Sequence, residues 1–310
     1  MDKYRSILQD FDETNIPDLD IAVMGALELL TTSELPRIQV PFSHPLVIGS
    51  VNAKTAGKMI FANTGAVFAD ESSYNKVLNQ NSDIDGVVLV SASGGKHAIN
   101  IADFVKSKDL SAYLLTNNRK APAAEYFEGE KVIVFPKNRE PYTYNTSTYL
   151  SMILSASNES ASDIKDFIET KVEPKLLRNF GSYSSFTLIV PPEFSEIRAM
   201  LSTKFDELFG PYINGRVFTS EEIKHAKTVV TSGDELFISF GSDNTEFGLP
   251  KNRLFVQLPE NAGYGAVMSV GYYVVGRIQR DHPPYFKQNI ASYTEKASKL
   301  FNQKIETIVE

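Results

Sequence analysis

The sequence predicts an α/β protein built from two similar halves, each with a mostly parallel β-sheet. Short apolar runs rich in Val, Ile, Leu and aromatic residues are bounded by Gly, Pro, Asn or Asp, which is typical of buried strands in a parallel sheet. Segments with a helical spacing of apolar residues separate these runs. The alternation occurs twice along 310 residues, a length that suits about two domains of ordinary size.

The first half contains four predicted strands, which are the apolar runs at 45–49, 86–90, 111–115 and 131–135. Predicted helices follow the first three strands, at 52–62, 96–107 and 121–127, and a further helix is expected at 146–157. Strand and helix alternating at this spacing indicate βαβ units with right-handed crossovers. Residues 1–44 are expected to form helices that pack on the core ahead of the first strand.

The second half repeats the pattern, with predicted strands at 186–190, 234–240 and 253–258. Helices are expected at 193–209, 220–228 and 263–280, and an amphipathic connecting helix at 163–175 precedes a loop at 181–185. We therefore expect two flavodoxin-like, three-layer αβα domains in tandem. Their expected boundaries are 45–160 for the first domain, 161–182 for the connecting helix and loop, and 183–310 for the second domain with its C-terminal tail.

Composition excludes several classes of function. Lys and Arg number 31 against 38 Asp and Glu, so the net charge of −7 makes nucleic acid and anionic membranes poor partners. The absence of cysteine excludes disulfides, thiolate metal sites and a cysteine nucleophile. Charged residues interrupt the first 30 positions, and no run of about 18 apolar residues occurs, so a cytoplasmic protein is expected.

The most informative motif follows the predicted strand at 86–90. Ser91 and Ser93 stand one residue apart, Gly94 and Gly95 come next, and a predicted helix begins at Lys96. Ligands bind at the carboxyl edge of a parallel sheet, and glycines let backbone N–H groups approach an anion at a helix N-terminus. Phosphate is a natural occupant. A turn rich in Ser and Gly also caps a helix without any ligand, and spacing alone leaves both interpretations open.

This turn resembles the S-x-S-G-x-T turn of the sugar isomerase (SIS) domain, which binds the phosphate of a phosphosugar. Further stretches resemble other SIS elements in the order of the family, from about residue 40 onward: 48–53, 114–118, 139–147, the E-x-K-H-like segment at 220–225, and 280–284. The resemblance implies two tandem SIS domains, similar to the isomerase half of glucosamine-6-phosphate synthase, to archaeal phosphoglucose/phosphomannose isomerases and to fructosamine-6-phosphate deglycases. It also implies a homodimer whose cleft residues are shared between subunits.

The sequence departs from the family pattern in both binding turns. In the first turn Val51 replaces a glycine and Ala53 a hydroxyl residue, which leaves Ser50 and Asn52 as candidate ligand contacts. In the second turn Lys96 stands in place of threonine, where its amine can meet the phosphate as a point charge or lie along the surface. Near the C-terminus an arginine is replaced by proline, and Lys287 lies one residue short of the family's lysine position.

Glu222 and His225 are the first candidates for catalysis. Aldose–ketose interconversion needs ring opening and a base that moves a proton between C1 and C2. The resemblance places the Glu222 carboxylate in the ligand cleft as that base, and His225 shares a helix face with it, as a ring-opening imidazole would. Helical spacing alone favours another interpretation, in which Glu222 stabilises a helix N-terminus after Thr219 or Ser220 and His225 lies on the surface.

A third set of candidates comes from the segment at 139–147 and from the C-terminal lysine. Glu140 follows Arg139 and precedes Pro141, so an exposed loop carboxylate is the alternative to a ligand contact. The resemblance makes Thr143, Thr146 and Ser147 phosphate or sugar contacts. Lys287 would stabilise an enediolate oxygen or meet an amine-bearing carbon, and the alternative is a solvated lysine on the terminal helix.

These patterns favour a phosphosugar isomerase or deglycase that acts on a hexose or aminohexose 6-phosphate. No metal-ligand pattern and no nucleotide-binding glycine motif after a strand occurs, so catalysis without a metal or an organic cofactor is expected. The altered first turn and the shifted lysine keep a non-catalytic phosphosugar sensor open as an alternative. A third, unrelated α/β enzyme would use the Ser-rich turn only as structure.

Overall fold

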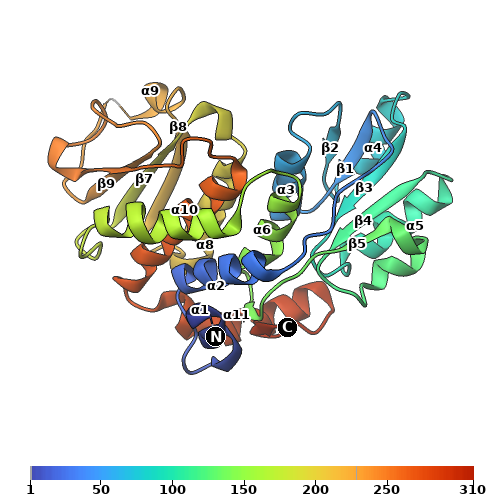
Figure 1. The fold of residues 1–310 in the computed structure, drawn as a ribbon, viewed down its shortest axis with the longest axis horizontal. Coiled ribbons are helices and arrows are strands. Elements are labelled where there is room, and N and C mark those ends of the chain that lie inside the picture. The colour runs from blue at the N-terminus through green and yellow to red at the C-terminus, as the bar shows by residue number, and fades with distance from the viewer. Residues whose placement is uncertain (1, 228) are drawn as a thin grey trace.

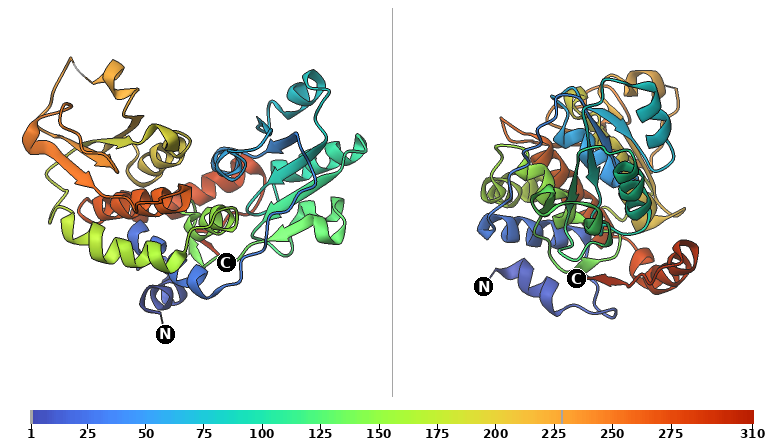
Figure 2. Two further views of the ribbon diagram at one scale, coloured as in Figure 1. Left: turned by 45° about the horizontal axis from the view of Figure 1, so that its top comes forward. Right: turned by 90° about the vertical axis from the view of Figure 1, so that its right-hand side faces the viewer.

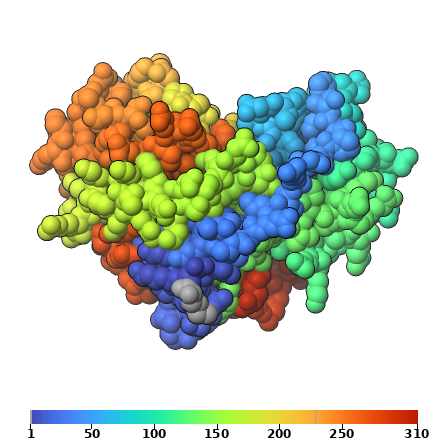
Figure 3. All heavy atoms as spheres, viewed as in Figure 1, coloured from blue at the N-terminus to red at the C-terminus, as the bar shows by residue number. Residues whose placement is uncertain are grey.

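Two parallel sheets lie at opposite ends of the molecule, with helices packed between them (Figure 1). The computed structural model describes residues 2–227 and 229–310. The two halves form a V in a second view, with a central group of helices at its base (Figure 2). A notch separates the halves on the surface (Figure 3), and Lys58 forms an ion pair with Glu196 between them, Nζ to Oε2 2.8 Å.

The first sheet has five parallel strands in the order β2-β1-β3-β4-β5. The strand order reverses between β1 and β3, which is the flavodoxin-like arrangement with its ligand-binding switch point at that place. The four predicted strands are confirmed, and β2 is an additional edge strand. The strands are β1 (Pro45–Ile48), β2 (Val67–Ala69), β3 (Gly86–Val90), β4 (Ala112–Thr116) and β5 (Val132–Val134).

Helices cover both faces of this sheet, so the first half has the three layers that the sequence predicts. Side chains alternate along each strand: Val88 of β3 packs into the central core, whereas Leu89 packs into a separate outer cluster. The inner layer contains α3 (Asn52–Ile60) and α6 (Thr146–Ser155). The outer layer contains α4 (Tyr74–Gln80), α5 (His97–Ser107) and the 3₁₀ turns Pro122–Tyr126 and Gly129–Lys131.

The second sheet has four parallel strands in the order β10-β9-β7-β8. Its switch point therefore lies between β7 and β9, in the same topological place as in the first sheet. Three strands were predicted, and β8 is additional. The strands are β7 (Ser185–Val190), β8 (Asn214–Thr219), β9 (Glu235–Phe240) and β10 (Arg253–Val256), and the inner face is covered by α8 (Ile197–Phe209) and α10 (Tyr264–Arg280).

The prediction of three layers is wrong for the second half, because no long helix covers the outer face of its sheet in the part of the chain that the structure describes. The helix expected at 220–228 is a single turn, α9 (Ile223–Ala226), and position 228 lies outside the described residues. Val229, Val230 and Thr231 are β-branched and Gly233 follows, a composition that opposes continuation of the helix. Only a small cluster of Ile189, Ile223 and Phe237 is buried on this face.

A central group of helices joins the halves. Helix α2 is apolar on almost every side and packs against α1, α6, α7 and α10, so the core runs without interruption from one sheet to the other. The remaining elements are α1 (Lys3–Asp10), α2 (Leu19–Thr32), α7 (Ala161–Phe167) with its continuation through Ile168–Val172 and Glu173–Lys175, the turns Pro192–Phe194 and Pro250–Asn252, α11 (Tyr285–Phe301), and the antiparallel pair β6 (Glu140–Pro141) and β11 (Ile308–Val309). Among the described residues, no helix has both the length and the apolar character needed to cross a membrane.

Candidate functional site

The turn after β3 is closed by its own serines. The Gly94 N–H donates to Ser91 Oγ at 3.2 Å, and the Gly95 N–H donates to Ser93 Oγ at 3.3 Å. Gly94 has a φ of +63°, and a Cβ at this position would lie 2.4 Å from the Cβ of Ala121. Both Gly94 and Gly95 are buried. The turn is therefore tight, requires glycine at position 94, and presents two hydroxyls and two amides together at the switch point.

Two neighbouring turns share an unusual backbone conformation. Val51 precedes α3 with φ 46° and ψ −111°, and Lys96 precedes α5 with φ 51° and ψ −124°. Only glycine adopts this region readily, so each residue costs about 1–3 kcal/mol of local strain. The turns follow β1 and β3, which are adjacent strands. Ser50 is partly exposed in the first turn, and Asn52 is buried with its Oδ1 atom unpartnered among the described residues.

Lys96 does not lie over the glycine turn but against aromatic side chains. Its Nζ donates to the Tyr142 hydroxyl at 3.1 Å and lies 4.3 Å from the centre of the Phe301 ring. Burial lowers the pKa of the Lys96 amine, because desolvation disfavours its charged form. The amine is thus a partly desolvated cation beside the turn, with an aromatic hydroxyl as its hydrogen-bond partner.

Glu140 has a structural contact that the sequence did not reveal. Its buried carboxylate accepts the N–H groups of Thr146 and Ser147, each at 2.7 Å, and so caps the N-terminus of α6. Ser147 Oγ accepts the Asn138 N–H at 2.8 Å. The Thr143 and Thr146 hydroxyls are buried and have no partner among the described residues. Of this predicted set, the two threonines therefore keep unused polar atoms.

Glu222 lies in a capping box. The Thr219 N–H donates to Glu222 Oε2 at 2.9 Å, the Glu222 N–H donates to Thr219 Oγ1 at 3.2 Å, and Arg198 lies 2.8 Å from the same carboxylate. His225 is exposed on the same short helix, α9. This helix lies at the opposite end of the long axis from α5, which carries the glycine turn (Figures 1 and 2). One chain therefore does not bring Glu222 and His225 to the turn after β3.

Lys287 also has a partner elsewhere. Its Nζ lies 2.8 Å from Asp18 Oδ1, and both side chains are less than one-third exposed. The lysine belongs to α11 and the aspartate precedes α2, so the pair fastens the C-terminal helix to the N-terminal segment. The predicted role of this amine, to stabilise an enediolate oxygen or to meet an amine-bearing carbon, stays a prediction.

A buried ion pair on α8 was not recognised in the sequence. The Lys204 side chain is 0% exposed, and its Nζ lies 2.5 Å from Glu207 Oε2 and donates to the Thr143 carbonyl. Burial raises the pKa of Glu207, and the Lys204 charge opposes that shift only in part. A carboxylate whose pKa is raised above its ordinary value is a stronger base and suits proton transfer. The signal in the sequence is the K-x-x-E spacing within the predicted helix at 193–209.

A cavity of about 470 Å³ opens beside this pair, between the end of α8 and the helix α11. Thr143, Glu207 and Tyr293 are among the residues that line it. The Tyr293 ring lies 5.9 Å from the ring of Tyr142, which is the partner of Lys96. Burial raises the pKa of Tyr142, and the nearby charge of Glu207 adds to the shift. These contacts define a strip that leads from Glu207 through Tyr293 and Tyr142 to Lys96 and the glycine turn.

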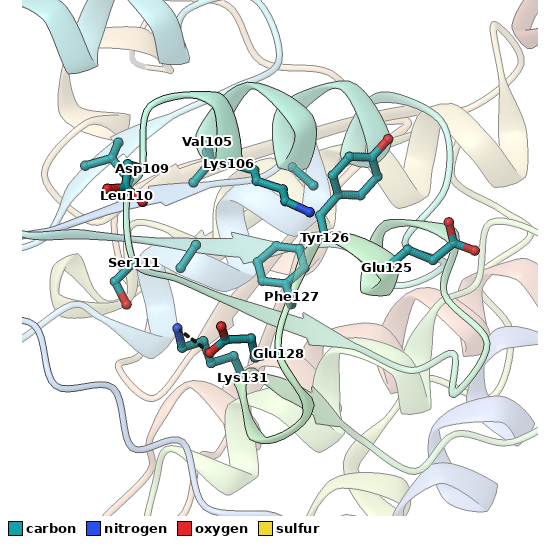
Figure 4. A pocket seen from close by; sticks show the side chains of 12 residues that line it. Val105, Lys106, Asp109, Leu110, Ser111, Glu125, Tyr126, Phe127, Glu128 and Lys131 are labelled. Atoms are coloured by element: carbon teal, nitrogen blue, oxygen red, sulfur yellow. Dashed lines mark ion pairs between the residues drawn. The ribbon is translucent and has the colours of Figure 1, made fainter.

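A second hollow, of about 430 Å³, lies away from this strip (Figure 4). It opens where β4 and β5 begin, at the amino edge of the first sheet, and Lys131 there forms an ion pair with Glu128 at 3.3 Å. Lys106 points toward the ring of Tyr126. Because ligands of parallel sheets bind at the carboxyl edge, the glycine turn after β3 is a better candidate binding site than this hollow, and the strip leads from that turn to the cavity at the end of α8. Among residues 2–227 and 229–310, no three His, Asp or Glu side chains gather as they would around a metal ion.

Solved structures share this fold. No family model and no curated protein matches the sequence. The C-terminal domain of glucosamine-fructose-6-phosphate aminotransferase from Francisella tularensis aligns with a TM-score of 0.58 at 12% identity, over 85% of this chain and 93% of that chain. Glucosamine-6-phosphate deaminase from Thermotoga maritima aligns with 0.55 at 14% identity, over 91% and 96%. A glucose-6-phosphate isomerase from Chlamydia trachomatis aligns with 0.52 at 13% identity, over 92% and 73%.

At these identities the comparisons establish the fold. These solved structures share the α/β architecture of this chain, so the prediction of an α/β fold with mostly parallel sheets is confirmed. Fold alone does not assign chemistry, which has to be argued from the residues of the site.

Proposed function

We propose that the protein is a phosphosugar isomerase with two SIS domains, one around each sheet. The observation that carries the proposal is the strip from the glycine turn through Lys96 and Tyr142 to the desolvated Lys204–Glu207 pair. A phosphate-binding turn at one end and a base at the other are the two parts that isomerisation of a sugar phosphate requires. A hexose or aminohexose 6-phosphate is the substrate class that fits both.

The glycine turn would bind the phosphate. In the free protein the Gly94 and Gly95 amides donate to Ser91 and Ser93. When phosphate arrives, the hydroxyls rotate to donate to its oxygens, and the amides are released to do the same at the N-terminus of α5. The Lys96 amine, which lies against the Tyr142 hydroxyl and the Phe301 ring and directly follows the glycine pair in sequence, would supply the positive charge.

Glu207 would act as the base. Its carboxylate removes the C2 proton of the open-chain aldose and returns it to C1 through an enediol intermediate, while one proton moves from the C2 hydroxyl to the C1 oxygen. Lys204 keeps the carboxylate ionised before it accepts the carbon-bound proton. The unpartnered hydroxyls of Thr143 and Thr146 are available to the sugar. Burial raises the pKa of this carboxylate and so makes it a stronger base.

Glu222 and His225 keep their proposed roles only in a homodimer. Their helix, α9, lies far from the glycine turn of the same chain (Figure 1), so a partner subunit would have to deliver them for proton transfer and ring opening. Glu222 would first have to leave its capping box, and Lys287 its ion pair with Asp18. Glu207 needs no such rearrangement and is therefore our first choice for the base.

A phosphosugar sensor without catalysis is the second candidate. It is favoured by the self-closed glycine turn and by the engagement of Lys96, Glu222 and Lys287 with other side chains. A sensor would bind the phosphosugar and leave its C1 and C2 protons in place. A deglycase, by contrast, would share the proton transfer and then release an amine.

Proton exchange in deuterated water separates these functions. Glucose, fructose and glucosamine 6-phosphates are incubated with the protein, and deuterium at C1 and C2 is followed by NMR. We expect exchange with at least one sugar and a loss of about 100-fold or more in Glu207→Gln. The control is Glu295→Gln, because Glu295 forms a similar Lys–Glu pair, with Lys299, but in solvent. Binding without exchange would establish a sensor, and the absence of binding by all three sugars would refute both functions.

A further inference from the structure

The second sheet has a pocket at its own switch point. The chain reverses its direction of strand addition between β7 and β9, and the pocket opens beside Ile189 and Phe240, at the carboxyl ends of these strands. This is the place where open α/β sheets bind ligands. The pocket, of about 180 Å³, lies on the thinly covered outer face, under the single turn α9 that follows β8 (Figure 1).

An unused polar atom faces this pocket. Ser239 is 1% exposed, lies on β9 among the lining residues, and its Oγ has no hydrogen-bond partner in the part of the chain that the structure describes. A buried hydroxyl without a partner is costly, so native structures rarely leave one without a bound molecule. Its neighbours on the strand, Phe237 and Glu235, are by contrast packed and paired.

The charges around the pocket argue against an anionic ligand. The Lys224 amine is held between both carboxylate oxygens of Glu221, each at 2.8 Å. Asp243 is exposed at the rim and accepts no hydrogen bond from any described residue, and Ser220 and Ser242 add hydroxyls. A phosphate would meet the Asp243 carboxylate, while Lys224 is paired with Glu221 and the Arg253 guanidinium already donates to loop carbonyls of Glu246, Phe247 and Gly248. Hydroxyl groups would instead donate to Asp243 and exchange hydrogen bonds with the serines.

We propose that this pocket binds a small uncharged polyol of about four or five carbons, at a site separate from the candidate active site. Apolar residues of the outer face, including Ile189, Ile223 and Phe247, would contact the C–H face of the polyol, while Ser239, Ser220 and Asp243 bind its hydroxyls. The space exceeds what a single water fills, since one water takes about 30 Å³ of liquid volume. The proposal does not depend on the reaction at the first sheet.

Ligand-observed NMR with erythritol and xylitol tests the proposal on the full chain. We expect saturable binding of at least one polyol, no competition by inorganic phosphate, and a loss of about tenfold in affinity in Ser239→Ala, the effect of one buried hydrogen bond. The control is Ser93→Ala in the glycine turn, which should leave polyol binding unchanged. Asp243→Asn should also weaken binding, because an amide accepts fewer hydrogen bonds than a carboxylate.

The melting temperature distinguishes a ligand-binding role of Ser239 from a purely structural role. Without ligand, Ser239→Ala should raise the melting temperature, because the substitution removes a buried hydroxyl that has no partner. With polyol present, the wild-type protein should gain more stability than Ser239→Ala at the same polyol concentration. Absence of saturable binding by both polyols would overturn the proposal, and so would equal affinity in the wild type and Ser239→Ala.

Discussion

The two sheets end in different chemistry although their strands follow the same order at the switch point. In the first sheet α5 begins directly after the turn that follows β3, and α3 directly after the turn that follows β1. In the second sheet β7 leads into Pro191 and a 3₁₀ turn before α8, and β9 leads into Gly241 and a loop without a helix. Only the first edge therefore directs the N-termini of two helices at a ligand.

The charged side chains also differ between the carboxyl edges of the two sheets. The first edge combines Ser91, Ser93 and Lys96 around two glycine amides, whereas the second combines serines with the carboxylates of Asp243 and Glu246. The two edges therefore share their strand order and differ in their polar groups. On our proposals the first edge would bind an anion and the second an uncharged polyol, a difference that net charge alone does not reveal.

The interior between the sheets shows a further contrast, in how buried charges are held. Lys204 and Glu207 form the buried pair of the first candidate site, and Glu140 caps α6 beside it. In the second half Glu159 caps α10, and its carboxylate accepts three N–H groups at 2.8 Å while remaining partly exposed. The polar contacts of Lys204 and Glu140 are therefore more fully buried than those of Glu159, and their removal should lower the free energy of unfolding by more.

The largest expected effect on stability is that of Lys204→Met. The substitution removes one partner of a buried pair and leaves Glu207 and the Thr143 carbonyl without the amine, a loss of about 3–5 kcal/mol in the free energy of unfolding. Urea denaturation measures it, with Lys299→Met as the control for an exposed Lys–Glu pair. A cost no larger than that of the control would show that the pair is not buried as described.

The destabilisation caused by Lys204→Met should also depend on pH. The folded pKa of Glu207 is raised above its ordinary value of 4.5, so its contribution to stability is present at low pH and is lost as the pH rises through the folded pKa. Without Lys204 that pKa rises further. The destabilisation of Lys204→Met should therefore be smaller at pH 5 than at pH 8, and the reverse order would contradict the assignment.

Phosphate should stabilise the protein through the first edge alone. At a concentration about 100 times its dissociation constant, inorganic phosphate or glucose 6-phosphate should add about 2.7 kcal/mol. The double variant Ser91→Ala, Ser93→Ala should lose most of this gain in a thermal-shift titration, because its hydroxyls can no longer donate to the anion. Ser239→Ala at the second edge should retain it. If the double variant and Ser239→Ala lost the same amount of phosphate stabilisation, phosphate binding would not be specific to the first edge.

The two capping carboxylates provide a smaller and matched comparison. Glu140→Ala leaves two buried amides without an acceptor and should cost about 2–3 kcal/mol. Glu159→Ala exposes its three amides to water, which replaces the carboxylate, so about 1 kcal/mol is expected. Chemical denaturation of both variants tests this order. A larger loss in the free energy of unfolding for Glu159→Ala would mean that the cap of α10 is the more buried of the two.

Much of the fold could be predicted because buried parallel strands are continuous apolar runs. Every strand predicted in this way is present, whereas β2 has only three residues and β8 opens with Asn214 and Gly215, so neither has the pattern. The outer helix of the second sheet was expected from alternation alone. The β-branched residues after α9 oppose such a helix. After β9 the chain also forms a loop, in which Arg253 donates to the carbonyls of Glu246, Phe247 and Gly248.

The candidate site was predictable only where a local motif defines it. Ser91 to Lys96 form one turn, so sequence places them together. Glu222 carries the same T-x-x-E spacing whether it caps a helix or shuttles protons, and the structure gives it the capping contacts. Lys204 and Glu207 read as an ordinary surface pair at i and i+3, because their burial arises from residues about 60 positions away, around Thr143.

The smallest expected effect concerns the strained turn before α3. Val51 is 66% exposed and contributes little packing, yet it has a φ of 46°, so Val51→Gly should release strain and raise stability by about 1 kcal/mol after the entropy cost of glycine. Val230→Gly is the control, because Val230 is 76% exposed without a positive φ and should instead lose stability. Thermal denaturation measures both. If Val51→Gly also tightens phosphate binding, the strain opposes the ligand; if only stability changes, the first edge tolerates valine where related turns use glycine.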